Sequence, residues 1–87
     1  PQKINYAEQR ERDKMVKRAA KKVQDAENEI TRLESEVADI EAQLAAGNVK
    51  GDILDRYSKT KRDLDNAMSV WELASQEHDD LATRFAR

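Results

Sequence analysis

The chain has no cysteine and very little glycine, proline or aromatic residue. Without cysteine it can form neither a disulfide nor a thiolate metal site, and a reducing compartment is compatible with it. Two glycines and one proline in 87 residues are too few for a fold built from strands and tight turns. No apolar run approaches the ~18 residues of a membrane span, and no secretory leader is visible. We therefore expect a cytoplasmic protein.

Charged residues are abundant instead, and they are unevenly distributed along the chain. They make up 39% of the residues, with a net charge of −2. Residues 1–22 hold eight Lys and Arg against three Asp and Glu, a net charge of +5. Residues 23–87 hold eight against fifteen, a net charge of −7. So much charge with so few helix breakers favours long helices whose burial is limited to a narrow seam.

Apolar residues follow a heptad spacing through the first half of the chain. They recur at alternating steps of three and four residues, and the residues between them are mostly charged. The spacing predicts a helix over about 6–46 that winds left-handedly around a partner helix. This seam consists of Val16, Ala19, Val23, Ala26, Ile30, Leu33, Val37, Ile40 and Leu44.

A turn at about 47–52 separates this helix from a second one. Gly47 suits the left-handed backbone conformation that ends a helix. Either Asp52 or Asn48 can cap the next helix with its side chain. A second heptad seam then predicts a helix over about 53–86. Its residues are Ile53, Tyr57, Thr60, Leu64, Ala67, Trp71, Ala74, His78, Leu81 and Phe85.

The short connection predicts an all-α fold, a two-helix antiparallel coiled-coil hairpin that forms a single domain over residues 1–87. Folding back about the turn places residues whose numbers add up to ~97 opposite each other. Trp71 then faces Ala26, and His78 faces Ala19, so large residues meet small ones. We expect Trp71 to be a buried core residue. We expect His78 to lie on the seam with one ring nitrogen reaching water.

No group of residues in the sequence predicts catalysis. His78 is the only histidine, and no cysteine or second histidine is present to share a metal ion with it. Acidic pairs such as Asp79-Asp80 would need a cleft, which a two-helix hairpin lacks. The serines have no base to activate them, and the glycines belong to the turn. We expect no enzymatic activity, no metal site and no cofactor in this chain.

Two groups of basic residues remain as candidate binding sites. The group just past the turn is expected to pair with acids of the first helix at the same height, which are Glu34, Glu36, Asp39 and Glu41. The group near the open end meets fewer acids, so phosphate contact and surface pairing both stay open there. The open-end group is Arg10, Arg12, Lys14, Lys17, Arg18, Lys21 and Lys22, and the other is Lys50, Arg56, Lys59, Lys61 and Arg62.

Four short motifs stand at the head, the turn and the end of the predicted hairpin. They are Y-A-E-Q-R-E at 6–11, A-A-G at 45–47, D-I-L at 52–54 followed by Y-S at 57–58, and V-W-E-L at 70–73. With these motifs, nearly the whole chain resembles the C-terminal coiled-coil domain of the ABC-F ATPases. These are the soluble tandem ATP-binding-cassette proteins of the Uup-like branch. Val70 departs from the family pattern, which often has arginine there.

The resemblance implies that the chain is part of a longer cytoplasmic protein whose two cassettes bind and hydrolyse ATP with magnesium. The beginning at Pro1-Gln2-Lys3, without an initiator Met, agrees with that expectation. In such proteins the arm is associated with DNA or with structured RNA on the ribosome, which by position implicates the basic residues from Arg10 to Lys22. A rival hypothesis is a spacer or protein-docking arm without nucleic-acid contact. A third is weak dimerisation into a four-helix bundle.

Overall fold

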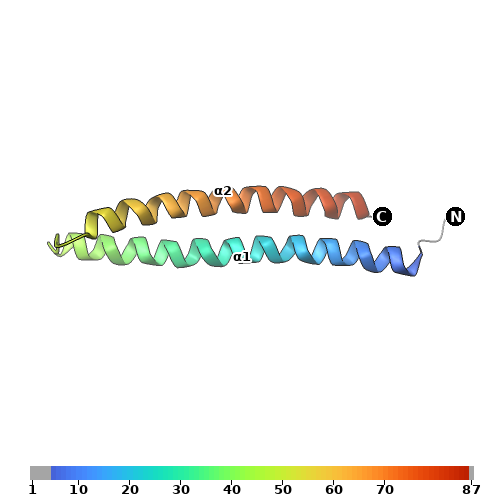
Figure 1. The fold of residues 1–87 in the computed structure, drawn as a ribbon, viewed down its shortest axis with the longest axis horizontal. Coiled ribbons are helices and arrows are strands. Elements are labelled where there is room, and N and C mark those ends of the chain that lie inside the picture. The colour runs from blue at the N-terminus through green and yellow to red at the C-terminus, as the bar shows by residue number, and fades with distance from the viewer. Residues whose placement is uncertain (1–4, 87) are drawn as a thin grey trace.

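Two long helices make up almost all of the structure. The computed structural model describes residues 5–86, so the Pro1–Lys3 beginning and Arg87 lie outside the described residues. Helix α1 spans Tyr6–Ala45 and helix α2 spans Ile53–Phe85. The two helices run side by side in opposite directions and are joined by one loop (Figure 1). The predicted all-α hairpin is confirmed, and each predicted helix end lies within one residue of the observed one.

Helix α1 begins with a side-chain cap. The Oδ1 atom of Asn5 accepts a hydrogen bond of 2.8 Å from the backbone N–H of Ala7. This bond satisfies one of the amides that the first turn of a helix leaves without a partner. Glu8 in the same turn places a negative charge near the positive end of the helix dipole. Both features favour a helix start at Tyr6.

Helix α1 ends in a Schellman motif. Gly47 has a φ of 84°, in the left-handed region that its missing Cβ allows. Its N–H bonds to the carbonyl oxygen of Leu44 at 3.0 Å, and the N–H of Asn48 bonds to that of Gln43 at 2.9 Å. These two bonds satisfy carbonyl groups that the helix end would leave free. The prediction that Gly47 ends the helix is confirmed.

The start of helix α2 differs from the prediction. Asp52 directly precedes the helix, but its side chain forms no capping hydrogen bond. The backbone of Asp52, with φ −94° and ψ 16°, is not in the extended conformation of a typical capping residue. Asn48 is not the cap either, since it lies in the Schellman motif of α1. The side chain of Asp52 therefore contributes its charge at the positive end of the helix, and its backbone carbonyl oxygen accepts a hydrogen bond of 2.9 Å from the N–H of Arg56.

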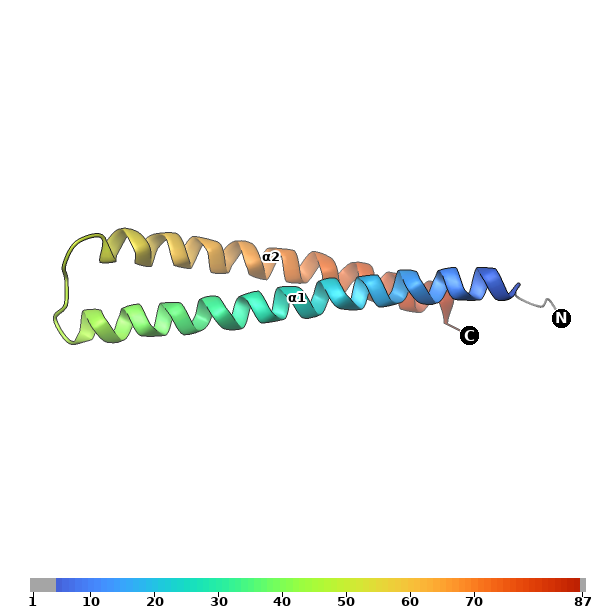
Figure 2. The same ribbon diagram turned by 60° about the horizontal axis from the view of Figure 1, so that its bottom comes forward.

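The two predicted seams face each other along the hairpin. In each helix, one of the two alternating seam positions is buried in every heptad, and the other is half-buried at nearly every repeat. The helices are side by side in one view and cross toward the open end in the other, as helices that wind around each other do (Figures 1 and 2). The buried residues are Ala19, Ala26, Leu33, Ile40, Ile53, Thr60, Ala67, Ala74 and Leu81.

Contacts between the helices confirm the predicted register. The Tyr57 hydroxyl donates to Glu41 at 2.8 Å near the turn. The Nζ of Lys22 lies 3.6 Å from a carboxylate oxygen of Glu77 farther along the rod. In both pairs the residue numbers add up to within about two of the ~97 expected for equal rise on both helices.

Trp71 differs from its prediction as a buried core residue. It occupies its predicted seam position, yet 36% of its surface is exposed. Its indole Nε1 donates a hydrogen bond of 3.2 Å to Glu27 Oε2 on α1. A two-helix seam has only two walls, so a ring of this size extends past the facing alanines into solvent. Trp71 is therefore a seam residue at the edge of the interface.

The molecule is a thin rod, 69 Å long and 16 by 15 Å across. Within residues 5–86, neither helix is long and apolar enough to cross a membrane. Such a rod has surfaces and shallow grooves in place of a deep pocket. Any site on it must therefore consist of side chains along one face.

Candidate nucleic-acid interface

The open-end basic group lies mainly on the outer face of α1. Residues 10, 14, 17 and 21 repeat at helical steps of four, three and four, on the side opposite the seam. Arg18 adjoins them, and all five side chains are exposed. We call this row the basic face, and it consists of Arg10, Lys14, Lys17, Arg18 and Lys21.

Four residues of the basic face have no acidic partner. Within residues 5–86, Arg10, Lys14, Lys17 and Arg18 form no salt bridge. Arg10, Lys14 and Lys17 line one shallow depression together with Asp13. Their charges are therefore available to an anion from solvent.

The two lysines at the end of the group do have partners. The Nζ of Lys21 lies 3.0 Å from Asp25 Oδ1, one turn along the same helix. Lys22 pairs with Glu77 across the hairpin. Both pairs are exposed to solvent, so phosphate can compete for the lysines at little cost. Lys22 lies at the flank of the seam, outside the basic face.

Arg12 is not placed as a phosphate-binding residue. It is half-buried, and its guanidinium carbon lies 5.2 Å from the centre of the Phe85 ring. This geometry is a cation–π contact across the seam. Arg12 lies one heptad before Ala19, so extending the predicted seam backwards would have revealed its packing role.

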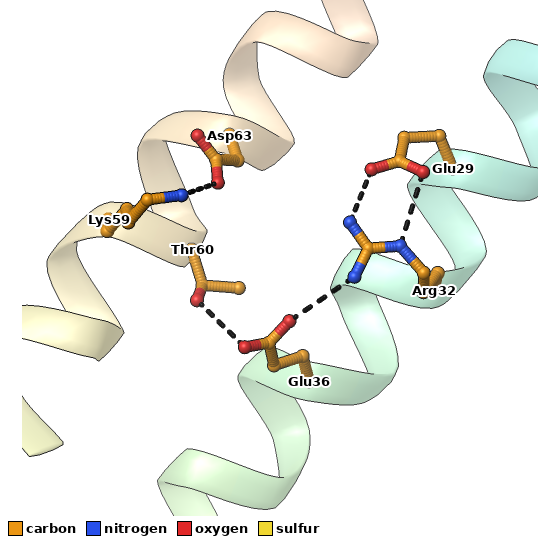
Figure 3. A network of polar contacts seen from close by, with 6 residues as sticks. All are labelled: Glu29, Arg32, Glu36, Lys59, Thr60 and Asp63. Carbon is orange, nitrogen blue, oxygen red and sulfur yellow. Dashed lines mark hydrogen bonds and ion pairs between the residues drawn. The ribbon is translucent and has the colours of Figure 1, made fainter.

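The basic group past the turn does not pair as predicted. None of its residues forms a salt bridge to α1 within the described part of the chain; Lys59 pairs instead with Asp63 of its own helix at 2.8 Å. Figure 3 shows Glu36, one of the expected partners, between the guanidinium of Arg32 and the hydroxyl of Thr60. Pairing between the helices was expected because the two groups lie at the same position along the rod. Side chains three or four residues apart on one helix are closer to each other than these groups are.

The network of Figure 3 also contains Glu29 and Arg32, two neighbouring groups whose pKa values are shifted. Glu29 and Arg32 are linked by two hydrogen bonds on the surface of α1. The hydrogen bond from Arg32 lowers the pKa of Glu29, and the same contact raises the pKa of Arg32. Both groups are exposed, so this pair is a local helix-stabilising contact.

His78 lies on the seam, as predicted. Its side chain is 34% exposed, and its Nδ1 lies 3.8 Å from Asp79 Oδ1. No group of three or more His, Asp or Glu side chains within residues 5–86 is arranged to hold a metal ion. We therefore interpret His78 as a side chain that packs between the two helices.

The basic face has the dimensions of a short nucleic-acid contact. From Arg10 to Lys21 the helix rises ~16 Å at 1.5 Å per residue. This length matches about five phosphates of one DNA strand, which are 3.4 Å apart along the axis. Lysine and arginine side chains can follow such a strand without reading its bases.

Comparisons with models of protein families, with curated proteins and with solved structures find no match to this chain.

Proposed function

We propose that this hairpin is an accessory arm that binds the phosphate backbone of DNA or structured RNA through the basic face of α1. The observation that carries the proposal is the row of four exposed cations without acidic partners, Arg10, Lys14, Lys17 and Arg18. The proposed parent is a soluble ATPase of the ABC-F type, in which the arm would supply affinity for nucleic acid and the cassettes would hydrolyse ATP.

Binding of this kind depends steeply on salt and weakly on sequence. Each neutralised phosphate releases condensed counterions, and the logarithm of affinity falls by about 0.9 per phosphate for each logarithm of salt concentration. Four contacts therefore predict a loss of about 100-fold in affinity between ~50 and ~200 mM salt. Because contacts to phosphates carry no sequence information, affinities for unrelated duplexes should be similar.

The test is fluorescence anisotropy of labelled double-stranded DNA and structured RNA across a salt series. One variant carries Lys14→Glu, Lys17→Glu, Arg18→Glu and Lys21→Glu. A control carries the same number of charge reversals near the turn, at Lys50, Arg56, Lys61 and Arg62. We expect the first variant to lose binding at ~50 mM salt and the control to retain most of it. Circular dichroism confirms that both remain helical.

Two results would refute this proposal. One is the absence of binding by the unmodified chain at ~50 mM salt, where phosphate contacts are strongest. The other is an equal loss of binding in both variants, which would indicate an unspecific effect of net charge. In the first case the rival function, a spacer or protein-docking arm, gains support from the length of the rod, 69 Å.

A further inference from the structure

Exposed apolar side chains are concentrated in one short stretch of α2. Met68 is 40% exposed, Val70 56% and Leu73 75%, and Trp71 lies beside them at the edge of the seam. Of these four residues only Trp71 occupies a seam position, so packing within the hairpin does not account for the others. An exposed apolar cluster on a highly charged rod indicates a surface that binds something.

The cluster divides between two grooves on opposite flanks of the hairpin. Val70 and Leu73 line one groove, whose rim contains Lys22, Asp25, Glu29 and Glu77. Met68 and Trp71 line the other together with Ile30 and Thr31, and its charged residues are Glu27 and Glu72. We call the second the acidic groove, and its lining is Glu27, Ile30, Thr31, Met68, Trp71 and Glu72.

Charge distinguishes the two grooves. In the first, Lys22 pairs with Glu77, Lys21 with Asp25, and Arg32 with Glu29, so its acids are neutralised. No lysine or arginine lines the acidic groove. Within residues 5–86 its Glu72 forms no salt bridge. The acidic groove therefore combines an apolar floor with uncompensated negative charge.

Acidic residues continue along the same flank in both directions, and Lys61, 5.1 Å from the centre of the Tyr57 ring, is a cation among them near the turn. Residues one heptad apart occupy equivalent places on a coiled coil. The Tyr57–Glu41 contact lies two heptads from the Trp71–Glu27 contact, which places Glu41 on the flank of Glu27. Two acidic rows thus border this flank; they are Glu27, Glu34 and Glu41 on α1, and Asp65, Glu72 and Asp79 on α2.

We infer that the acidic groove docks a basic amphipathic helix of another protein, which would lie against the hairpin as a third helix of the coiled coil. Apolar residues of that helix would cover Ile30, Met68 and Trp71. Lysine or arginine residues on either side of them would face the two acidic rows. Coiled coils choose partners through such flanking charges. This surface is distinct from the basic face, so the inference does not depend on the proposed nucleic-acid binding.

A second copy of the chain fits the groove less well. The basic face of such a copy presents a row of cations but contains no large apolar residue. Such a face could meet the acidic rows but would leave the apolar floor uncovered. The occupant must carry apolar residues and cations on the same side of one helix.

Trp71 is suited to anchor the partner. Partly exposed tryptophan and methionine are enriched among residues that dominate binding energy at interfaces. The hydrogen bond from its indole to Glu27 holds the ring in place before binding, which lowers the entropy that binding must remove. As the only tryptophan of the chain, Trp71 also reports on the groove by its fluorescence.

The experiment titrates the chain with a synthetic helical peptide about three heptads long, which has leucine at both seam positions and lysine at the flanking ones. A control peptide has glutamate in place of each lysine, and neither contains tryptophan. We expect saturable binding of the lysine peptide with a blue shift of Trp71 emission, and affinity for the control at least ~10-fold lower.

Matched variants locate the binding site. Met68→Gln should weaken binding of the lysine peptide by about 10-fold, as expected for a residue near the centre of an interface. Leu73→Gln, at a more exposed leucine on the opposite flank, should leave the affinity unchanged within about 2-fold. Glu34→Gln combined with Glu72→Gln should reduce the salt dependence of lysine-peptide binding. Circular dichroism checks that each variant stays folded.

Four results would overturn the inference. They are no emission shift with the lysine peptide, equal affinity for both peptides, a Leu73→Gln loss as large as that of Met68→Gln, and a dimer of the chain alone with blue-shifted emission. The last would assign the groove to a second copy, and sedimentation at several concentrations would detect it. Loss of nucleic-acid binding in the basic-face variant bears on none of these outcomes.

Discussion

The half of the hairpin near the turn and the half near the open end are packed differently. Near the turn three of the five buried positions hold large side chains, since Leu33, Ile40 and Ile53 are 2%, 0% and 4% exposed, and the other two hold Thr60 and Ala67. Toward the open end most of these positions hold alanine, and Leu81 is the one large buried residue there among residues 5–86. Apolar burial stabilises by ~25 cal/mol per Å². The free energy of folding is therefore concentrated near the turn.

The candidate binding surfaces lie away from the half with the larger core. The basic face lies at the open end, and the acidic groove lies between the ends, where alanines line the seam. Small seam residues bury little area, which leaves the large Trp71 ring partly exposed at the edge of the seam. The basic face thus lies on the half with the smaller core, and the acidic groove lies near the middle of the rod. The half with the larger core holds the two helices together.

The largest expected effect is that of Ile40→Ala. Ile40 is fully buried, so truncation leaves a cavity and should lower the free energy of unfolding by about 3 kcal/mol. Leu81→Ala in the open-end half should lower the free energy of unfolding by less, since fewer large neighbours surround Leu81. Urea denaturation followed by circular dichroism measures both, with the exposed Leu54→Ala as a control expected below ~0.5 kcal/mol. An equal or larger loss for Leu81→Ala would contradict the comparison between the halves.

Trp71→Ala should have the next largest effect, about 1–2 kcal/mol. Truncating a fully buried tryptophan costs about 3–5 kcal/mol, but this ring is only partly buried. The change also removes the indole hydrogen bond to Glu27, which is exposed and contributes little. Trp71→Phe keeps a ring without the hydrogen bond and separates the two contributions. A loss above ~3 kcal/mol in urea denaturation would show that the ring is more deeply buried in solution.

The heptad spacing was sufficient to predict both helices, the turn and the register. Two regular seams allow several antiparallel registers one heptad apart, and the short connection between the helices selects one of them. Details that depend on side-chain and backbone angles did not follow from the spacing. Asp52 precedes α2 without capping it, because its backbone is not extended. Lys59 pairs within its own helix, although acids of α1 lie at the same height.

The sites were predicted less completely than the fold. Sequence reasoning grouped the open-end cations but missed that Arg12 belongs to the seam, since the seam was begun at Val16. The acidic groove was missed entirely. Its signal was available in Met68, an apolar residue outside the seam, and in the heptad spacing of Glu27, Glu34 and Glu41. Nucleic-acid binding itself stays a prediction, because charge on a helix face does not specify its partner.

His78→Leu should change stability little and in the favourable direction. The ring is half-buried on the seam of the open-end half, and its Nδ1 lies 3.8 Å from Asp79 Oδ1. Leucine would add apolar area to a region with few large core residues, so we expect a gain of up to ~1 kcal/mol. Thermal denaturation measures the change in stability. A clear loss of stability would indicate a polar role for His78 that its packing does not explain.

The smallest expected effect concerns pH and the Glu29–Arg32 pair. Hydrogen bonding to Arg32 lowers the pKa of Glu29 below its ordinary value of 4.5. A lowered carboxyl pKa contributes stability that is fully present above the unfolded pKa and is lost as pH falls through the folded value. Arg32 has a raised pKa and stays charged over this range, so it adds no pH dependence of its own.

Urea midpoints of Glu29→Gln and of the unmodified chain should therefore differ slightly at pH 7 and converge as the pH falls below 4.5 through the lowered pKa of Glu29. The difference should also shrink at ~1 M salt, because both side chains are exposed and screened. Glu34→Gln, which removes an acid without a salt bridge among the described residues, should show no comparable convergence. A difference that persists unchanged at low pH would show that Glu29 acts through packing or helix propensity in place of its charge.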